Sequence, residues 1–118
     1  FVAYVPPGSL ERGRALVDLG GMTVMNNEIV QGRTTACTAC HGLDLMGVAD
    51  VPPIAGRSPS YIARQLFDIQ QGTRNGPNLQ LMRLVVARLS PEDMVDVAAY
   101  VASRFPPVRP AAALVSQR

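Results

Sequence analysis

The chain has 118 residues, of which 47% are hydrophobic and 17% are charged, a composition typical of one globular domain rather than of a disordered chain. Its eleven basic residues are all arginines spread along the sequence against nine acidic residues, which disfavours a nucleic-acid partner. No apolar run reaches the roughly 18 residues that a membrane-spanning helix needs, so no transmembrane segment is predicted. Because Phe1 opens the chain and no signal-peptide pattern precedes the first helical pattern, we expect a signal peptide to be absent from this chain.

The N-terminal third is predicted to hold a linker, one helix and an irregular stretch. Residues 1–8 contain two prolines and a glycine and are predicted to be a linker or N-terminal extension. Ser9 is a candidate N-cap, and Gly20 follows the last helical position. The apolar positions that share one helical face are Leu10, Gly13, Leu16 and Val17. The stretch 22–36 has no clear periodicity and is predicted to be an irregular excursion.

The C-terminal half predicts two further helices with strong end signals. Ser58 is a predicted N-cap, and Gly72 is a predicted C-terminal stop. The apolar face between them consists of Ile62, Leu66 and Ile69. A shorter apolar segment, 81–89, leads to a second N-cap, Ser90, with Asp93 three residues later as the acidic half of a capping box. Both helices have proline at the first helical position, and the last one is predicted to end before Pro106 and Pro107.

The sequence predicts an all-α fold with three main helices, short ones and long loops. No segment alternates with a period of two over enough residues to be a credible strand. The compact domain is predicted to cover 9–104, and residues 105–118 form a Pro/Ala-rich tail.

Both cysteines and the one histidine lie within five positions, as Cys37, Cys40 and His41. A tetrahedral zinc site would need a fourth ligand, and the sequence has no further Cys or His. A thioredoxin-like dithiol would be expected near a βαβ pattern, which is absent. A structural disulfide would not explain why the histidine directly follows the second cysteine. The spacing Cys-x-x-Cys-His is instead typical of covalent haem attachment, with two thioethers to the porphyrin and an imidazole beneath the iron.

Several motifs together resemble a class I c-type cytochrome, and specifically the domains of the bacterial cytochrome c4 and c553 group. They span nearly all of residues 10–103 and read "RGRAL", "CTACHG", "PPIAG", "YIARQLFDIQQGTR", "LMRLVVARLSPEDM" and "AAYVAS". The resemblance implies a class I cytochrome c fold wrapped around one covalent haem, with the first and last helices crossing at Gly13 and Tyr100. The stretch 22–36 departs from the family, which has a shorter link before the haem motif.

The second axial ligand of the iron is predicted to be a methionine, since no second histidine exists. Met22 and Met25 lie in the irregular stretch. Met46 is too close to His41 to reach the opposite face, and Met94 falls within the last helix. Met82 remains, and it stands where the resembling family carries its axial methionine.

The resemblance also implies residues around the haem. A proline carbonyl accepts a hydrogen bond from the axial histidine, and Pro52 matches that position, with Pro53 as its rival. Ile54 of the same "PPIAG" motif belongs to the predicted haem-binding set. Arg57 and Arg74 are candidates to bind the haem propionates through paired hydrogen bonds.

The function predicted is transfer of one electron by a single haem c, because an iron with both axial positions filled has no open site for a substrate. The partners are then other redox proteins that dock weakly, and the chain is an electron carrier or the electron-transfer domain of a multihaem protein or a dehydrogenase complex, rather than an enzyme. The alternative is a haem sensor or haem enzyme with an open or displaceable sixth position. A haem-free binding module is a third and weaker interpretation. The resemblance implies a periplasmic location in bacteria.

Overall fold

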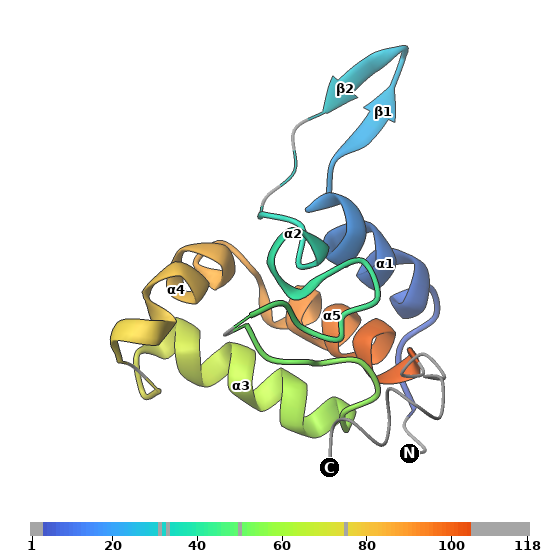
Figure 1. Cartoon of the computed structure of the whole chain (residues 1–118). Coiled ribbons are helices and arrows are strands. Elements are labelled where there is room, and N and C mark those ends of the chain that lie inside the picture. The colour runs from blue at the N-terminus through green and yellow to red at the C-terminus, as the bar shows by residue number, and fades with distance from the viewer. Residues whose placement is uncertain (1–3, 31, 33, 50, 75, 105–118) are drawn as a thin grey trace, which may run out of the picture.

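The computed structural model describes residues 4–30, 32, 34–49, 51–74 and 76–104. In chain order these form α1 (Ser9–Leu19), β1 (Thr23–Met25), β2 (Glu28–Val30), α2 (Thr38–His41), α3 (Pro59–Gln71), the 3-10 helix η1 (Pro77–Leu79), α4 (Gln80–Val86) and α5 (Pro91–Ser103). The longer helices α1, α3 and α5 form the body of the domain, the short helix α2 packs against α1, and α4 packs beside one end of α3 (Figure 1). The mostly helical fold is confirmed, whereas the predicted tail, 105–118, lies outside the described residues.

Helices α1 and α5 cross where Gly13 lacks a side chain. A Cβ atom on Gly13 would lie 2.0 Å from the backbone oxygen of Asp96 and 2.8 Å from Cβ of Tyr100. Because a packed interior has no room for such an overlap, any side chain at this position would force the two helices apart. The helix crossing implied by the resemblance is therefore present, and the atom nearest to the Gly13 Cβ position is the backbone oxygen of Asp96.

Ser9 is not the N-cap that the sequence predicts. Helix α1 already includes Ser9, its N-cap is Gly8, and no side chain caps it. The Ser9 hydroxyl is buried and donates a 2.7 Å hydrogen bond to the carboxylate of Asp96 on α5. The guanidinium of Arg12 donates to both oxygens of the same carboxylate, at 2.9 and 3.3 Å. A buried carboxylate needs donors, and here that need outweighs the local preference of serine for a cap.

The predicted ends of α3 and α5 are confirmed. The Ser58 hydroxyl accepts a 3.1 Å hydrogen bond from the backbone amide of Tyr61, and α3 ends at Gln71 with Gly72 as its C-cap. At α5 the capping box is complete, because the Ser90 hydroxyl accepts from the amide of Asp93 at 3.0 Å and the Asp93 carboxylate accepts from the amide of Ser90 at 2.9 Å. Satisfying these end amides fixes where each helix begins.

The hydrophobic core lies between α1, α3, α5 and the loop that follows α2. The predicted faces of α1 and α3 supply Leu16, Val17, Ile62, Leu66 and Ile69, and α5 supplies Met94, Val97, Ala98, Tyr100 and Val101. The prediction for Leu10 is wrong, since this side chain is 48% exposed. The buried face of α1 is formed instead by Ser9, Gly13, Leu16 and Val17, and Leu10 lies outside it.

The stretch 22–36 is not irregular throughout, because it contains a β-hairpin that the sequence analysis missed. Strands β1 and β2 pair antiparallel, with Val24 opposite Ile29. Asn26 and Asn27 form the turn with φ of 53° and 64°, the left-handed values of a type I′ turn. The hairpin projects away from the helices, and Ile29 is 72% exposed (Figure 1). Three-residue strands are too short to give a clear period-two pattern.

Candidate functional site

The short helix α2 brings Cys37, Cys40 and His41 together. The amide of His41 donates a 2.9 Å hydrogen bond to the carbonyl of Cys37, so one helical turn separates the first cysteine from the histidine. Cys37 is partly buried against the core, and Cys40 is exposed. Burial raises the pKa of the Cys37 thiol to about 11, so this thiol is protonated and neutral at physiological pH.

The imidazole of His41 is held in one orientation by a proline carbonyl. His41 is buried, and its Nδ1 lies 2.8 Å from the backbone oxygen of Pro52. A carbonyl can only accept, so Nδ1 carries the proton and Nε2 has a free lone pair. Nε2, the ring nitrogen that Pro52 does not engage, is therefore the one available to bind a metal ion. The rival carbonyl, that of Pro53, accepts from Nε of Arg57 at 3.1 Å.

Leu45, in the loop after α2, holds the segment that follows Pro52 and Pro53 in place. Its carbonyl accepts hydrogen bonds from the amides of Ile54 and Ala55, at 2.8 and 3.1 Å. Leu45 is 2% exposed and has a φ of 59°, a left-handed conformation that is unfavourable for a bulky side chain. Burial in the core and these two hydrogen bonds compensate for that strain. Sequence reasoning did not identify Leu45, since its backbone conformation leaves no local signal.

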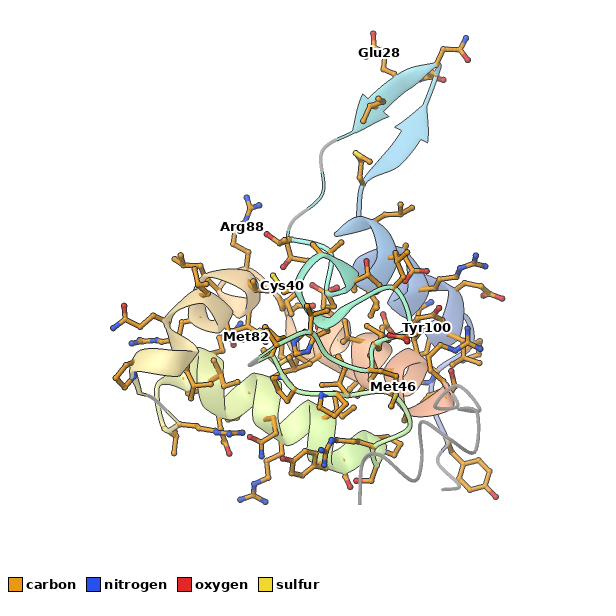
Figure 2. All side chains as sticks on the ribbon, in the orientation of Figure 1. Glu28, Cys40, Met46, Met82, Arg88 and Tyr100 are labelled. Atoms are coloured by element: carbon orange, nitrogen blue, oxygen red, sulfur yellow. The ribbon has the colours of Figure 1, made fainter. Side chains whose placement is uncertain are left out.

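The methionines occupy distinct places around this site. Met82 on α4 and Met46 in the loop after α2 are both partly buried against the core. In Figure 2, Met82 lies on the α4 side below Cys40, whereas Met46 lies on the other side, toward Tyr100. Met94 is 3% exposed within the core, and Met22 is 41% exposed.

Comparison with known proteins identifies the family. Residues 28–104, more than half of the chain, match the family model of cytochrome c. The chain belongs to the cytochrome c family. Cytochrome c4 of Pseudomonas aeruginosa is 33% identical over 107 residues, covering 86% of this chain and 53% of the relative. The crystal structure of reduced cytochrome c4 from Pseudomonas stutzeri superposes with a TM-score of 0.68 at 28% identity, covering 89% of this chain and 53% of that one.

A third relative is named as the thiosulfate dehydrogenase electron acceptor of Stutzerimonas stutzeri. It is 45% identical over 69 residues, which cover 57% of this chain and 32% of the relative. This chain therefore spans about half, or less, of the length of these three relatives. The comparisons confirm a class I c-type cytochrome related to the c4 group, a family of electron-transfer proteins with covalent haem.

The donor set around α2 fits the haem of a c-type cytochrome. Two thiols and an imidazole oriented by the Pro52 carbonyl are the groups that thioether attachment and axial ligation require. Ile54, the remaining apolar residue of the predicted haem-binding set, is partly buried against the same core.

Arg57 and Arg74 are not brought together in this cytochrome. Arg57 precedes α3 and Arg74 follows it, so their backbones stand at opposite ends of a helix about 20 Å long. The guanidinium of Arg57 lies 5.7 Å from the ring centre of Tyr61. The guanidinium of Arg74 donates to the side-chain oxygen of Gln65.

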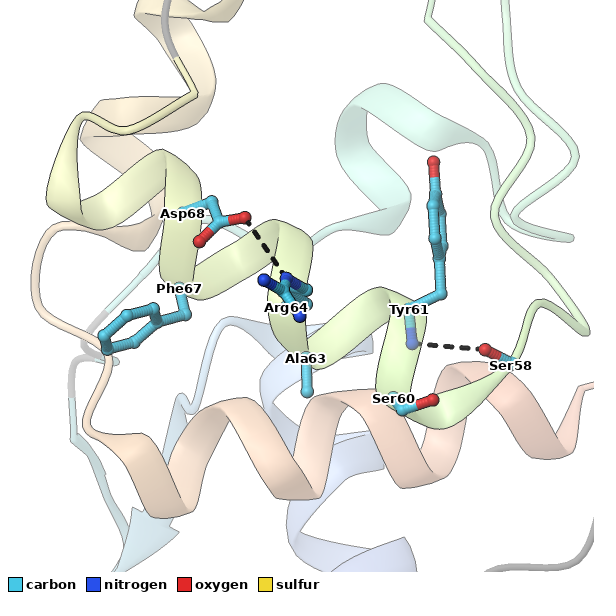
Figure 3. A pocket seen from close by; sticks show the side chains of 7 residues that line it. All are labelled: Ser58, Ser60, Tyr61, Ala63, Arg64, Phe67 and Asp68. Atoms are coloured by element: carbon cyan, nitrogen blue, oxygen red, sulfur yellow. Dashed lines mark hydrogen bonds and ion pairs between the residues drawn. The ribbon is translucent and has the colours of Figure 1, made fainter.

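A surface pocket on the outer face of α3 is separate from the cysteine site. Figure 3 shows its lining, which includes Tyr61, Phe67 and the ion pair between Arg64 and Asp68. None of the residues predicted to bind haem lines it. Among the described residues, no helix is both long and apolar enough to cross a membrane.

Proposed function

We propose that this chain binds a single haem c through thioethers to Cys37 and Cys40, with His41 and Met82 as the axial ligands of the iron, and carries one electron between redox partners. The bound haem supplies an iron that cycles between two oxidation states. The single observation that carries the proposal is the hydrogen bond between Nδ1 of His41 and the carbonyl of Pro52. It leaves Nε2 as the nitrogen available to the iron and fixes the ring, as is typical of histidine ligands in metal sites.

The cysteines suit covalent attachment. A thioether forms when a thiol adds across a vinyl group, so the sulfur must be reduced and unpaired. The raised pKa of Cys37 keeps its thiol protonated and slow to oxidise, since the thiolate is the reactive form in disulfide chemistry. The exposure of Cys40 leaves the second sulfur accessible.

Met82 is the proposed second ligand. Its thioether is a soft donor that stabilises reduced iron and raises the reduction potential. Met82 lies in the first half of α4, and its side chain packs against the core while staying partly exposed, which suits a ligand at the edge of the core. Pro52 positions His41, Ile54 packs against the haem, and Arg57 and Arg74 are proposed for its propionates, each from its own end of α3.

The proposed partners are redox proteins of the bacterial periplasm. One relative is named as an electron acceptor of thiosulfate dehydrogenase, and another as the cytochrome subunit of a sulfide dehydrogenase. The domain 9–104 would accept electrons from such a dehydrogenase, or belong to its complex or to a multihaem protein. Docking of this kind uses small, weak interfaces that allow rapid turnover.

Optical spectra of the purified holoprotein test the ligand set. We expect the ferric protein to show the weak band at the red edge of the visible spectrum that reports a sulfur-to-iron bond. We expect the ferrous protein not to bind carbon monoxide. Met82→Leu should abolish the band and admit carbon monoxide, while the matched variant Met46→Leu should behave like the wild type. Absence of the band and ready carbon monoxide binding in the wild type would refute the proposal in favour of an open sixth position.

A further inference from the structure

The segment between β2 and α2 is fastened on both sides just before the cysteines. The amide of Thr34 donates a 3.2 Å hydrogen bond to the carbonyl of Gly20, at the end of α1. The hydroxyl of Thr34 donates a 2.5 Å hydrogen bond to the carbonyl of Val85, in the last turn of α4. Thr34 therefore joins the end of α1 to the end of α4.

Close packing fixes the position of this segment. A Cβ atom on Gly32 would lie 2.0 Å from the carbonyl oxygen of Gly20, so the two backbones are in direct contact. The guanidinium of Arg88 reaches the carbonyl of Gly32 at 3.5 Å. In Figure 2, Arg88 projects above α4.

The end of α4 depends on side chains from outside the helix. The last carbonyls of any α-helix have no partner within it. Here the amide of Gln70 on α3 donates to the carbonyls of Val86 and Leu89, at 2.8 and 2.7 Å, and the hydroxyl of Thr34 donates to that of Val85. Helix α4 is thus held from one side by α3 and from the other by the segment that precedes α2.

We propose that Thr34 is a positioning residue that keeps Met82 at the iron, an inference that rests on the proposed function. Met82 lies one helical turn before Val85, and Thr34 lies seven residues before His41. The hydroxyl of Thr34 therefore links the chain segment of one proposed axial ligand directly to the helix of the other, across 51 residues of sequence. Without it, the end of α4 loses one side-chain donor while the Gln70 contacts remain, and the helix that carries Met82 moves away from α2 more readily.

Binding of free imidazole to the ferric holoprotein tests this role, because imidazole can bind only when the methionine has left the iron. Thr34→Val keeps the shape of the side chain and removes the donor, and we expect about tenfold tighter imidazole binding, the effect of one lost hydrogen bond. Thr34→Ser retains the hydroxyl and should bind imidazole as the wild type does. Thr35→Val makes the same change at the neighbouring exposed residue and should also leave binding unchanged.

Ser58→Ala distinguishes a general loss of stability from a specific loss of Met82 positioning. It removes the cap at the start of α3, so it should lower global stability without tightening imidazole binding. Thr34→Ala serves in place of Thr34→Val if the latter does not fold. Equal imidazole affinity in Thr34→Val and the wild type, or an equal shift in Thr35→Val, would overturn the inference. Failure of the proposed function is recognised in the wild type alone, which would then lack the sulfur-to-iron band, and it would overturn this inference as well.

Discussion

The hydroxyl of Ser9 and the carboxylate of Asp96, 87 residues apart in the chain, form a buried 2.7 Å hydrogen bond between α1 and α5. Asp96→Ala removes the carboxylate that accepts from both the buried Ser9 hydroxyl and the Arg12 guanidinium, so we expect a loss of about 1–3 kcal/mol in the free energy of unfolding. Urea denaturation of the holoprotein measures it. Asp68→Ala, which breaks only a surface pair with Arg64, should cost no more than about 0.5 kcal/mol, and an equal loss in both variants would contradict this view.

Gly13→Ala tests the helix crossing through the sign of its effect. Alanine stabilises an exposed helix by about 1 kcal/mol relative to glycine. At Gly13 the new methyl group would meet the carbonyl of Asp96, so we expect a net loss of about 1–3 kcal/mol. Thermal and urea unfolding should show the loss, and Arg14→Ala on the exposed side of the same helix should be nearly neutral. A stabilised Gly13→Ala protein would show that the two helices can separate without penalty.

Two serine caps should contribute similarly to stability, although they begin different helices. Ser58→Ala and Ser90→Ala each remove one acceptor from a helix end, and we expect each to lose about 1 kcal/mol on urea unfolding. Aspartate at either position should retain most of that stability, because its carboxylate also accepts from the end amides. Ser60→Ala, in the first turn of α3 but outside the cap, is the control and should change little. A loss at Ser60 equal to that at Ser58 would exclude capping as the cause.

The helix ends were predictable because their signals are local. Ser58, Ser90 and Gly72 act on amides and carbonyls within a few residues, so their roles can be recognised in a short window of sequence. Ser9 shows the limit of this reasoning. Its hydroxyl had two uses, a cap or a partner for Asp96, and only the packing of α1 on α5 decides between them.

The candidate site was predictable from its motif more than from its geometry. Cys37, Cys40 and His41 stand in one run, and the family resemblance indicated Pro52 rather than Pro53 as the partner of His41, which the 2.8 Å contact now shows. Met82 stays a prediction as a ligand. The bond between Thr34 and Val85 spans 51 residues and left no signal, because its acceptor is a backbone carbonyl, which any residue at position 85 would supply.

The hairpin was missed although one signal was present. Asn-Asn favours the left-handed turn that Asn26 and Asn27 form, but strands of three residues are too short to add a recognisable alternation. The resemblance indicated only that this part of the chain departs from the family. The length of the departure was visible in the sequence, whereas its structure was not.

Removal of the hairpin should leave the domain intact. Replacing residues 24–29 by Asn-Gly shortens the projection while keeping Gly20 and Thr34, which fasten its base. Because Ile29 is 72% exposed, its side chain buries little apolar surface, and we expect the free energy of unfolding to change by less than about 0.5 kcal/mol. The sulfur-to-iron band should persist. Leu16→Ala, a substitution at a residue only 4% exposed, is the positive control and should cost about 2–5 kcal/mol. A shortened protein as unstable as Leu16→Ala would show that the hairpin supports the core directly.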